Sequence, residues 1–324
     1  MRRRTRWLLA VAFLLVAAAW LALRWFPPAQ EPGYRFVRSW GASGEGPGQL
    51  REPIGVALGG DEVFVSDAGT HRIQVFDRSG RFLRSFGREG EGPGELGRPM
   101  HIAYHDGKLY VAEYLNDRIQ IFSAAGQSLA TIGAPGSGPG EFDAPAGVAV
   151  DASGRLWVAD FYNHRVQLLA SDGTFLRQLG TTRKKGIRAG RFNYPTDVAV
   201  LPDERLVVAD AYNDRLQLFT SEGRFLQKWG GPLAVDIPGS FNGWFKVATA
   251  VAAGPAGNIF VADFYNHRVQ KFTAHGDFLV TLGGRGTEPG RFEHPTDVAV
   301  DEEGRLYVVD FGNQRIQVFA SVTR

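Results

Sequence analysis

Cysteine is absent from this chain of 324 residues. Its absence excludes disulfide bonds, thiol nucleophiles, metal sites built on cysteine and a lipid-modified cysteine anchor. Three familiar catalytic signatures are also missing: the Gly-x-Ser-x-Gly elbow, the His-Glu-x-x-His zinc motif and the phosphate-binding loop. Helical periodicity is nearly absent after residue 26. The sequence therefore favours an all-β fold and contains none of these catalytic motifs.

Charge is lacking in one N-terminal run. Four arginines at positions 2, 3, 4 and 6 precede an uncharged stretch over residues 7–23. Such a stretch has about the minimum length for a membrane-spanning helix, and the basic flank orients the N-terminus to the cytoplasm. We expect residues 1–26 to form a transmembrane anchor, which leaves the rest of the chain extracytoplasmic. The alternative is a signal peptide cleaved after Ala19, which would give a secreted or periplasmic protein.

A proline-rich segment over residues 27–33 predicts a short, stiff linker after the anchor. The first 30 residues contain five arginines and no acid. The rest of the chain therefore has 31 of the 36 basic residues and all 34 acidic residues. The remainder is therefore mildly acidic and lacks the basic footprint that nucleic-acid binding needs.

The rest of the chain repeats one phrase six times. Its clearest copies begin at Asp160 and Asp263 and read Asp-Phe-Tyr-Asn-His-Arg-Val-Gln. An acid precedes an arginine by five positions in every copy, and the arginines stand at positions 72, 118, 165, 215, 268 and 315. Because neighbouring arginines are 46 to 53 residues apart, the chain has a repeat architecture.

Each period contains four short segments with the pattern of β-strands. The first follows a proline, as residues 147–150 follow Pro145, and the second and third join at the Asn-x-Arg turn. The fourth follows a glycine turn, as in residues 175–180. Four strands in about 40–50 residues are typical of one β-propeller blade, so residues 34–324 are predicted to form six blades.

The two ends of the repeat region predict how the ring closes. Residues 36–41 have the fourth-strand pattern but precede the first blade, whereas the sixth repeat ends after its third strand. We expect the N-terminal segment to supply the outer strand of the last blade, because this pairs both otherwise open edges.

The repeated phrase resembles the NHL repeat, whose proteins are six-bladed β-propellers, from about Tyr34 to Phe319. The resemblance implies the fold but leaves the function broad. Proteins similar in this way include scaffolds that bind RNA or protein, extracytoplasmic sensor domains of bacterial kinases, and a few lyases. Export and the acidic charge of the repeat region argue against the RNA-binding branch.

Two kinds of residue carry candidate chemistry. The acid and arginine of the phrase are interpreted as structural, because a pair present in all six blades cannot mark one active site. Alignment of the first strands instead places His101, Asp197 and Asp297 at equivalent positions near the expected central channel. Converging there, they would bind a divalent metal or act as acid and base. The alternative is that both aspartates start a strand and bond to backbone.

A second candidate site is a rim for partner binding. Residues of the loop between second and third strands differ from blade to blade and include Tyr162 with His164, Tyr212 with Asp214, and Tyr265 with His267. If these loops share one rim, they form an aromatic arc suited to a partner. Packing of the tyrosines between blades is the alternative.

Two insertions break the period and extend this rim. One, over residues 181–188, is basic and contains Lys184 and Lys185, and the other, over residues 232–247, contains Trp244. Inserted loops in repeat proteins often lie on the binding face, although the basic loop would also suit anionic lipid.

The sequence therefore predicts a membrane-anchored, extracytoplasmic and non-enzymatic propeller that binds a protein, peptide or glycan and needs no cofactor. The alternative function is a metal-assisted lyase or hydrolase with its site at the central channel.

Overall fold

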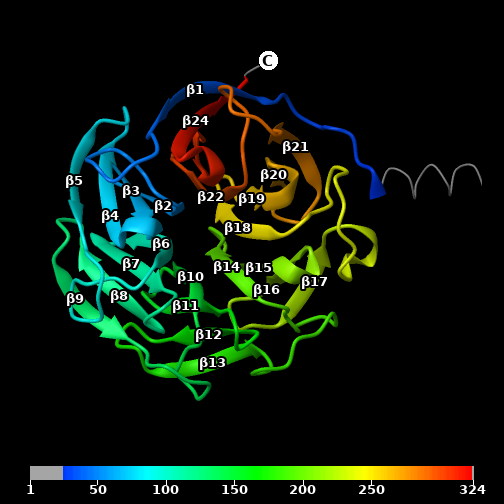
Figure 1. The fold of residues 1–324 in the computed structure, drawn as a ribbon. Helices are drawn as coiled ribbons and strands as arrows, with labels where there is room; N and C mark the ends of the chain where they lie inside the picture. The colour runs from blue at the N-terminus through cyan, green and yellow to red at the C-terminus, as the bar shows by residue number, and fades with distance from the viewer. Residues whose placement is uncertain (1–24, 323–324) are drawn as a thin grey trace, which may run out of the picture.

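The computed structural model describes residues 25–322, and these form six four-stranded antiparallel sheets arranged around a central axis (Figure 1). Blades one to three contain β2 to β5 (Pro53–Gly59, Glu62–Asp67, Arg72–Asp77, Phe82–Phe86), β6 to β9 (Pro99–His105, Lys108–Glu113, Arg118–Ser123, Ser128–Ile132) and β10 to β13 (Pro145–Val150, Leu156–Asp160, Arg165–Leu169, Phe175–Gly180). Blades four and five contain β14 to β17 (Pro195–Val200, Leu206–Asp210, Arg215–Phe219, Phe225–Trp229) and β18 to β21 (Ala248–Ala253, Ile259–Asp263, Arg268–Phe272, Phe278–Gly283). Blade six contains β22 to β24 (Pro295–Val300, Leu306–Asp310, Arg315–Ser321) and β1 (Tyr34–Trp40).

The sixth blade closes the ring as the sequence predicts. β1 pairs antiparallel with β24, from Tyr34 opposite Ser321 to Trp40 opposite Ile316. In Figure 1, β1 therefore lies beside β24 at the outside of this blade, near the C-terminus. The outer strand of blade six thus comes from the beginning of the repeat region, and this pairing removes the exposed edge of β24.

The hydrophobic core of the described residues is divided into six clusters, each shared by two neighbouring blades. Between blades three and four, for example, Trp157 packs with Phe192 and Phe219. Trp157 is 2% exposed, and burial of each large side chain of this kind contributes roughly 1.5–3 kcal/mol. Because a single blade cannot bury both its faces, the stability of the ring depends on contacts between blades.

The predicted anchor or signal segment lies outside the described residues, except for Trp25 and Phe26 at its end. Within residues 25–322, the structure contains no helix that combines the length and the apolar character needed to cross a bilayer. Its helical turns are short 3-10 segments, four of which join second to third strands: Ala68–Thr70, Ala211–Asn213, Phe264–Asn266 and Phe311–Asn313.

Candidate functional site

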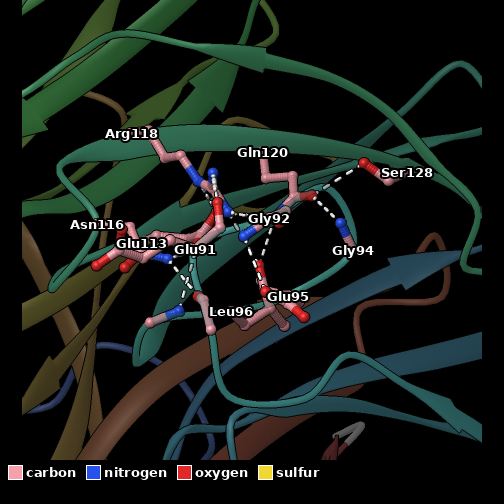
Figure 2. Close-up of polar contacts among 12 residues, drawn as sticks. Glu91, Gly92, Gly94, Glu95, Leu96, Glu113, Asn116, Arg118, Gln120 and Ser128 are labelled. Atoms are coloured by element: carbon pink, nitrogen blue, oxygen red, sulfur yellow. Dashed lines mark hydrogen bonds and ion pairs between the residues drawn. The ribbon is translucent and has the colours of Figure 1, made fainter.

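The acid and arginine of the repeated phrase form a buried ion pair in every blade. The arginine Nε lies 2.7 to 2.9 Å from a carboxylate oxygen, and the acid is fully buried in all six cases. Figure 2 shows the pair of blade two, where Arg118 also donates to the carbonyl oxygens of Gly92 and Glu95. The arginine therefore ties the loop that enters each blade to the blade itself, which is the structural role that the repetition predicts.

A buried glutamine two residues after each arginine completes this clamp. In blade two, Gln120 accepts the N–H of Gly94 and donates to Glu113 and to the carbonyl of Glu95 (Figure 2). The clamp holds charge in an apolar surrounding at a cost. In blades three and four burial raises the pKa of Asp160 and of Asp210 to about 6, although hydrogen bonds and the neighbouring arginines act in the opposite direction.

A second repeated contact joins each blade to the next. The residue just before the arginine adopts the left-handed backbone conformation, and its side chain accepts a backbone N–H from a left-handed residue that precedes the next blade. We call this contact the latch. The six latches run from acceptor to donor as His71 to Arg98, Asp117 to Ala144, His164 to Tyr194, Asp214 to Val247, His267 to His294 and Gln314 to Glu52, with distances of 2.6 to 3.3 Å.

The latches change the role of three residues that the sequence places on a binding rim. His164 is 8% exposed and Asp214 is 6% exposed, so neither presents its side chain to a partner. His267 is partly buried and accepts the amide of His294 at 3.1 Å. These three side chains therefore face the blade junctions, because the left-handed conformation turns them toward the following blade.

The tyrosines of the same loops have the opposite orientation. Tyr162, Tyr212 and Tyr265 are 44%, 48% and 50% exposed, and Leu115 at the equivalent position of blade two is 60% exposed. Blades one and six have glycine at this position. The exposed row therefore spans blades two to five. Tyr114, Phe161 and Tyr194 lie beneath it. We call the row and these three supporting residues the aromatic crescent.

Contacts within the aromatic crescent join its residues from blade two to blade four. The hydroxyl of Tyr114 donates to that of Tyr162 at 2.8 Å, and the Tyr194 ring lies 5.8 Å from the Tyr162 ring and 5.2 Å from the Tyr212 ring. Partial burial raises the pKa of Tyr212, and the nearby hydroxyls of Tyr265, Tyr162 and Tyr194 raise it further. The supporting residues Tyr114, Phe161 and Tyr194 escaped the sequence prediction, although Tyr114 and Phe161 directly precede the exposed positions.

The axial candidates do converge at the centre of the ring. His101, Asp197 and Asp297 are each 5% exposed, and His101 Nδ1 lies 3.4 Å from an Asp197 oxygen. The other Asp197 oxygen accepts the N–H of Val251 in blade five, and Asp297 accepts that of Val56 in blade one. Both aspartates therefore bond to backbone, as the structural alternative predicts, and join their blades to the next.

The protonation of His101 weakens the metal interpretation. Burial disfavours its charged form, but attraction to Asp197 and Asp297 outweighs this and raises its pKa to about 9. The imidazole then carries a proton at neutral pH, and a divalent metal would have to displace that proton. The prediction of a metal or catalytic site at the axis stays a prediction.

Another group with metal-ligand chemistry lies at the junction of blades five and six. His267, Glu293 and His294 each place one potential ligand atom within 4.8 Å of the others, and no further group of this kind occurs in residues 25–322. However, His267 Nδ1 accepts the latch N–H, so its neutral ring carries the proton on Nε2. Metal binding at Nε2 would require the other tautomer and loss of the latch, so we interpret the group as structural.

The linker is docked against blade five. The indole N–H of Trp244 donates to the carbonyl of Trp25 at 2.6 Å, and the side chain of Asn242 donates to that of Pro27. Farther along, the N–H of Gln30 donates to the carbonyl of Leu279 on β21. The indole N–H of Trp244, which the sequence places on the partner rim, is therefore already used within the chain.

The two insertions lie next to each other. Arg215 and Lys228 both donate to the carbonyl oxygens of Ile187 in the first insertion and Ala234 in the second. Lys184 and Lys185 of the first insertion are exposed, as a role in binding would require.

Comparison with protein families matches the model described as the NHL repeat to residues 50–76, 142–167, 192–219, 245–272 and 292–319. A search by sequence among curated proteins finds no match. Among solved structures, a streptogramin B lyase is similar with a TM-score of 0.58 and 17% identity, over 84% of this chain and 94% of that one. A structural genomics protein of unknown function from Bacteroides thetaiotaomicron has a TM-score of 0.67 and 16% identity, over 90% and 76%.

A catalytically inactive virginiamycin B lyase from Staphylococcus aureus, solved with quinupristin, has a TM-score of 0.58 and 15% identity, over 90% of this chain and 87% of that chain. Likenesses at these identities show the propeller fold and leave the chemistry of this chain to its own residues.

Proposed function

The chain is a six-bladed β-propeller built from NHL repeats, and we propose from that premise that it is a non-enzymatic binding module. Its ligand is a protein, peptide or glycan, captured on the face that bears the aromatic crescent. We also propose that residues 7–23 anchor it in a membrane with the propeller on the extracytoplasmic side. Cleavage after Ala19, giving a secreted or periplasmic propeller, is the alternative for its location.

The exposure of the aromatic crescent carries the binding proposal. Tyrosines that only packed between blades would be buried, whereas Tyr162, Tyr212 and Tyr265 keep about half of their surface in water, at 44%, 48% and 50%. Exposed tyrosines combine an apolar ring with a hydrogen-bonding hydroxyl, and such residues dominate binding hot spots. Because Tyr114, Phe161 and Tyr194 hold the row from below, the surface is rigid before a ligand arrives.

The test is a binding screen of the full chain in detergent against arrays of peptides and glycans. Any ligand found should bind Tyr162→Ala and Tyr212→Ala about tenfold or more weakly, since removal of a central aromatic contact costs this much. Leu129→Ala is the matched control, because Leu129 is 48% exposed on β9, away from the aromatic crescent. Equal binding by all three variants would show that the crescent is not the binding surface.

A metal-assisted lyase or hydrolase with chemistry at His101, Asp197 and Asp297 is the second candidate. One observation favours it, namely that a buried histidine and two buried carboxylates converge at the axis, with His101 Nδ1 3.4 Å from an Asp197 oxygen. Metal content and divalent-ion thermal shifts of the full chain, repeated with Asp197→Asn and Asp297→Asn, test this candidate. Stoichiometric metal that both variants lose would favour the enzyme, and absence of any ion-dependent shift would favour the binding module.

A further inference from the structure

The insertion over residues 232–247 joins blade four to blade five and also fixes where the chain enters the propeller. The Phe26 ring lies 4.7 Å from that of Phe241 and stacks on Trp244 at 5.8 Å. Together with the bond from the Trp244 indole to the Trp25 carbonyl, these contacts hold residues 25 and 26 on the insertion. The entry point is therefore set by packing and hydrogen bonding, and Figure 1 shows it at the outside of the ring beyond β21.

Several apolar side chains around this contact are exposed to solvent. Five side chains form what we call the apolar patch: Trp25, Phe26, Leu233, Ile237 and Phe241, with exposures of 37%, 45%, 75%, 41% and 53%. Trp25, Leu233 and Trp244 line one groove of about 580 Å³, which connects the linker part of the patch with the insertion part. Contiguous exposed apolar surface of this kind marks an interaction site.

The backbone at Leu233 is strained as well. Leu233 has φ of 58° and ψ of 0°, a left-handed conformation that a bulky side chain adopts only at a cost in free energy. Folding places this leucine both in a strained conformation and in water. Both costs become understandable if the side chain enters an apolar environment that the isolated propeller lacks.

The sequence before the apolar patch identifies that environment. The uncharged run over residues 7–23 ends two positions before Trp25, so the patch lies where the propeller meets the segment proposed to span the membrane. Tryptophan suits the interfacial layer of a bilayer because its indole is apolar and carries a polar N–H, and phenylalanine and leucine enter the apolar side of that layer.

Charge near the apolar patch fits the same partner. The first insertion presents Arg183, Lys184, Lys185 and Arg188, all exposed, and it adjoins the second through the shared contacts of Arg215 and Lys228. Basic side chains close to an apolar surface attract anionic headgroups. The two insertions thus combine an apolar and a cationic surface on one side of the ring.

We infer that the apolar patch inserts into the interfacial layer of a bilayer containing anionic lipid and thereby fixes the orientation of the propeller. The inference rests on the membrane anchoring in the proposed function. The aromatic crescent lies on the turns between second and third strands, and both insertions contact these turns through the bonds from Asp236 to Asn213 and from Arg183 to Asn163.

The absence of cysteine makes a direct test possible. Leu233→Cys, Ile237→Cys and Phe241→Cys are labelled with a small fluorophore in the full chain, which is reconstituted into phosphatidylcholine and phosphatidylglycerol vesicles. Some of the lipids carry a nitroxide near the headgroup. Leu129→Cys and Leu176→Cys are matched controls, because both leucines are similarly exposed, at 48% and 46%, on the outer strands of blades two and three. Far-ultraviolet circular dichroism of each variant confirms folding.

Quenching several times stronger at the three patch positions than at the controls supports the inference. Quenching at the patch positions should be weaker in vesicles of phosphatidylcholine alone, and also in the double variant Lys184→Gln, Lys185→Gln. Either result supports the role of the basic insertion. If the chain floats with vesicles but patch and control labels are quenched equally, the patch inference is overturned and the anchor stands. If the chain does not float, both are overturned, while ligand binding by the aromatic crescent is tested independently.

Discussion

Tyr194 donates its backbone N–H to Nδ1 of His164 at 3.1 Å, and this bond latches blade three to blade four. Both residues have left-handed backbones, with φ of 52° and 53°. The acceptor is histidine at three of the six latches, His71, His164 and His267, and these alternate around the ring with Asp117, Asp214 and Gln314. Because a protonated imidazole nitrogen cannot accept a hydrogen bond, the latches of His164 and His267 depend on pH.

The histidine latches predict a loss of stability in acid. Burial lowers the pKa of His164, and Lys185 lowers it further; burial also lowers that of His267, as does His294. The unfolded chain, with histidine near its ordinary value of 6.5, therefore binds more protons than the folded chain as the pH falls through this range. The contribution of the His164 and His267 latches to the free energy of unfolding is complete above the unfolded value of 6.5 and is lost as the pH falls through the lowered pKa of the folded state, as measured by urea titration.

Blade six offers the matched control, because Gln314 performs the same latch without a titrating group. The double variant His164→Gln, His267→Gln should keep its latches and lose part of this pH dependence. An unchanged slope of unfolding free energy against pH would contradict the role of the histidines, since all other titrating groups are common to both proteins.

Loss of one arginine clamp should be costly. Arg165 is 1% exposed and is the ion-pair partner of Asp160, which is fully buried. Arg165→Ala leaves that carboxylate without its counter-charge, and we expect a loss of about 3–5 kcal/mol in unfolding free energy. Arg81→Ala removes a pair with Asp77 at the surface, where solvent screens the charges, and should cost far less. Equal losses in urea titration would contradict the structural role of the clamp.

Close approach of first strands at the axis predicts a requirement for glycine. A Cβ at Gly147 would lie 2.7 Å from the Asp197 Cα, where backbone leaves no room to move. Gly147→Ala should therefore destabilise the ring by about 1–3 kcal/mol through overpacking. Gly186→Ala is the control, because its Cβ would contact only the flexible side chain of Arg191, at 3.3 Å. Thermal unfolding of the two variants should differ accordingly.

Docking of the linker should depend on one indole N–H. Trp244→Phe keeps an aromatic ring but removes the bond to the Trp25 carbonyl. Loss of a hydrogen bond worth about 0.5–1.5 kcal/mol should increase amide hydrogen exchange in residues 26–31 by about two- to tenfold. Trp229→Phe is the control, since its indole nitrogen has no partner among the described residues. Identical exchange in both variants would show that packing alone holds the linker.

The turn of blade three shows which features the sequence predicts and which it does not. The phrase from Asp160 to Arg165 predicts a turn and a structural ion pair, and the structure contains both. It leaves open whether Tyr162 is exposed or packs between blades, and in the structure this side chain is 44% exposed. The same reasoning placed His164 beside Tyr162 on the rim. Its partner Tyr194 is 30 residues away, and neither its left-handed backbone nor its proximity follows from local pattern.

The sequence by itself determined the number of blades, their strands and the closure by β1, because strand patterns, turn residues and the period are local properties of the chain. Tertiary structure decided which polar residues face a neighbour and which face water. In the closed ring His164 bonds to Tyr194 of the next blade, His101 lies beside Asp197, and Trp244 bonds to Trp25. Each contact joins residues that are far apart in the sequence and that only the tertiary structure brings together.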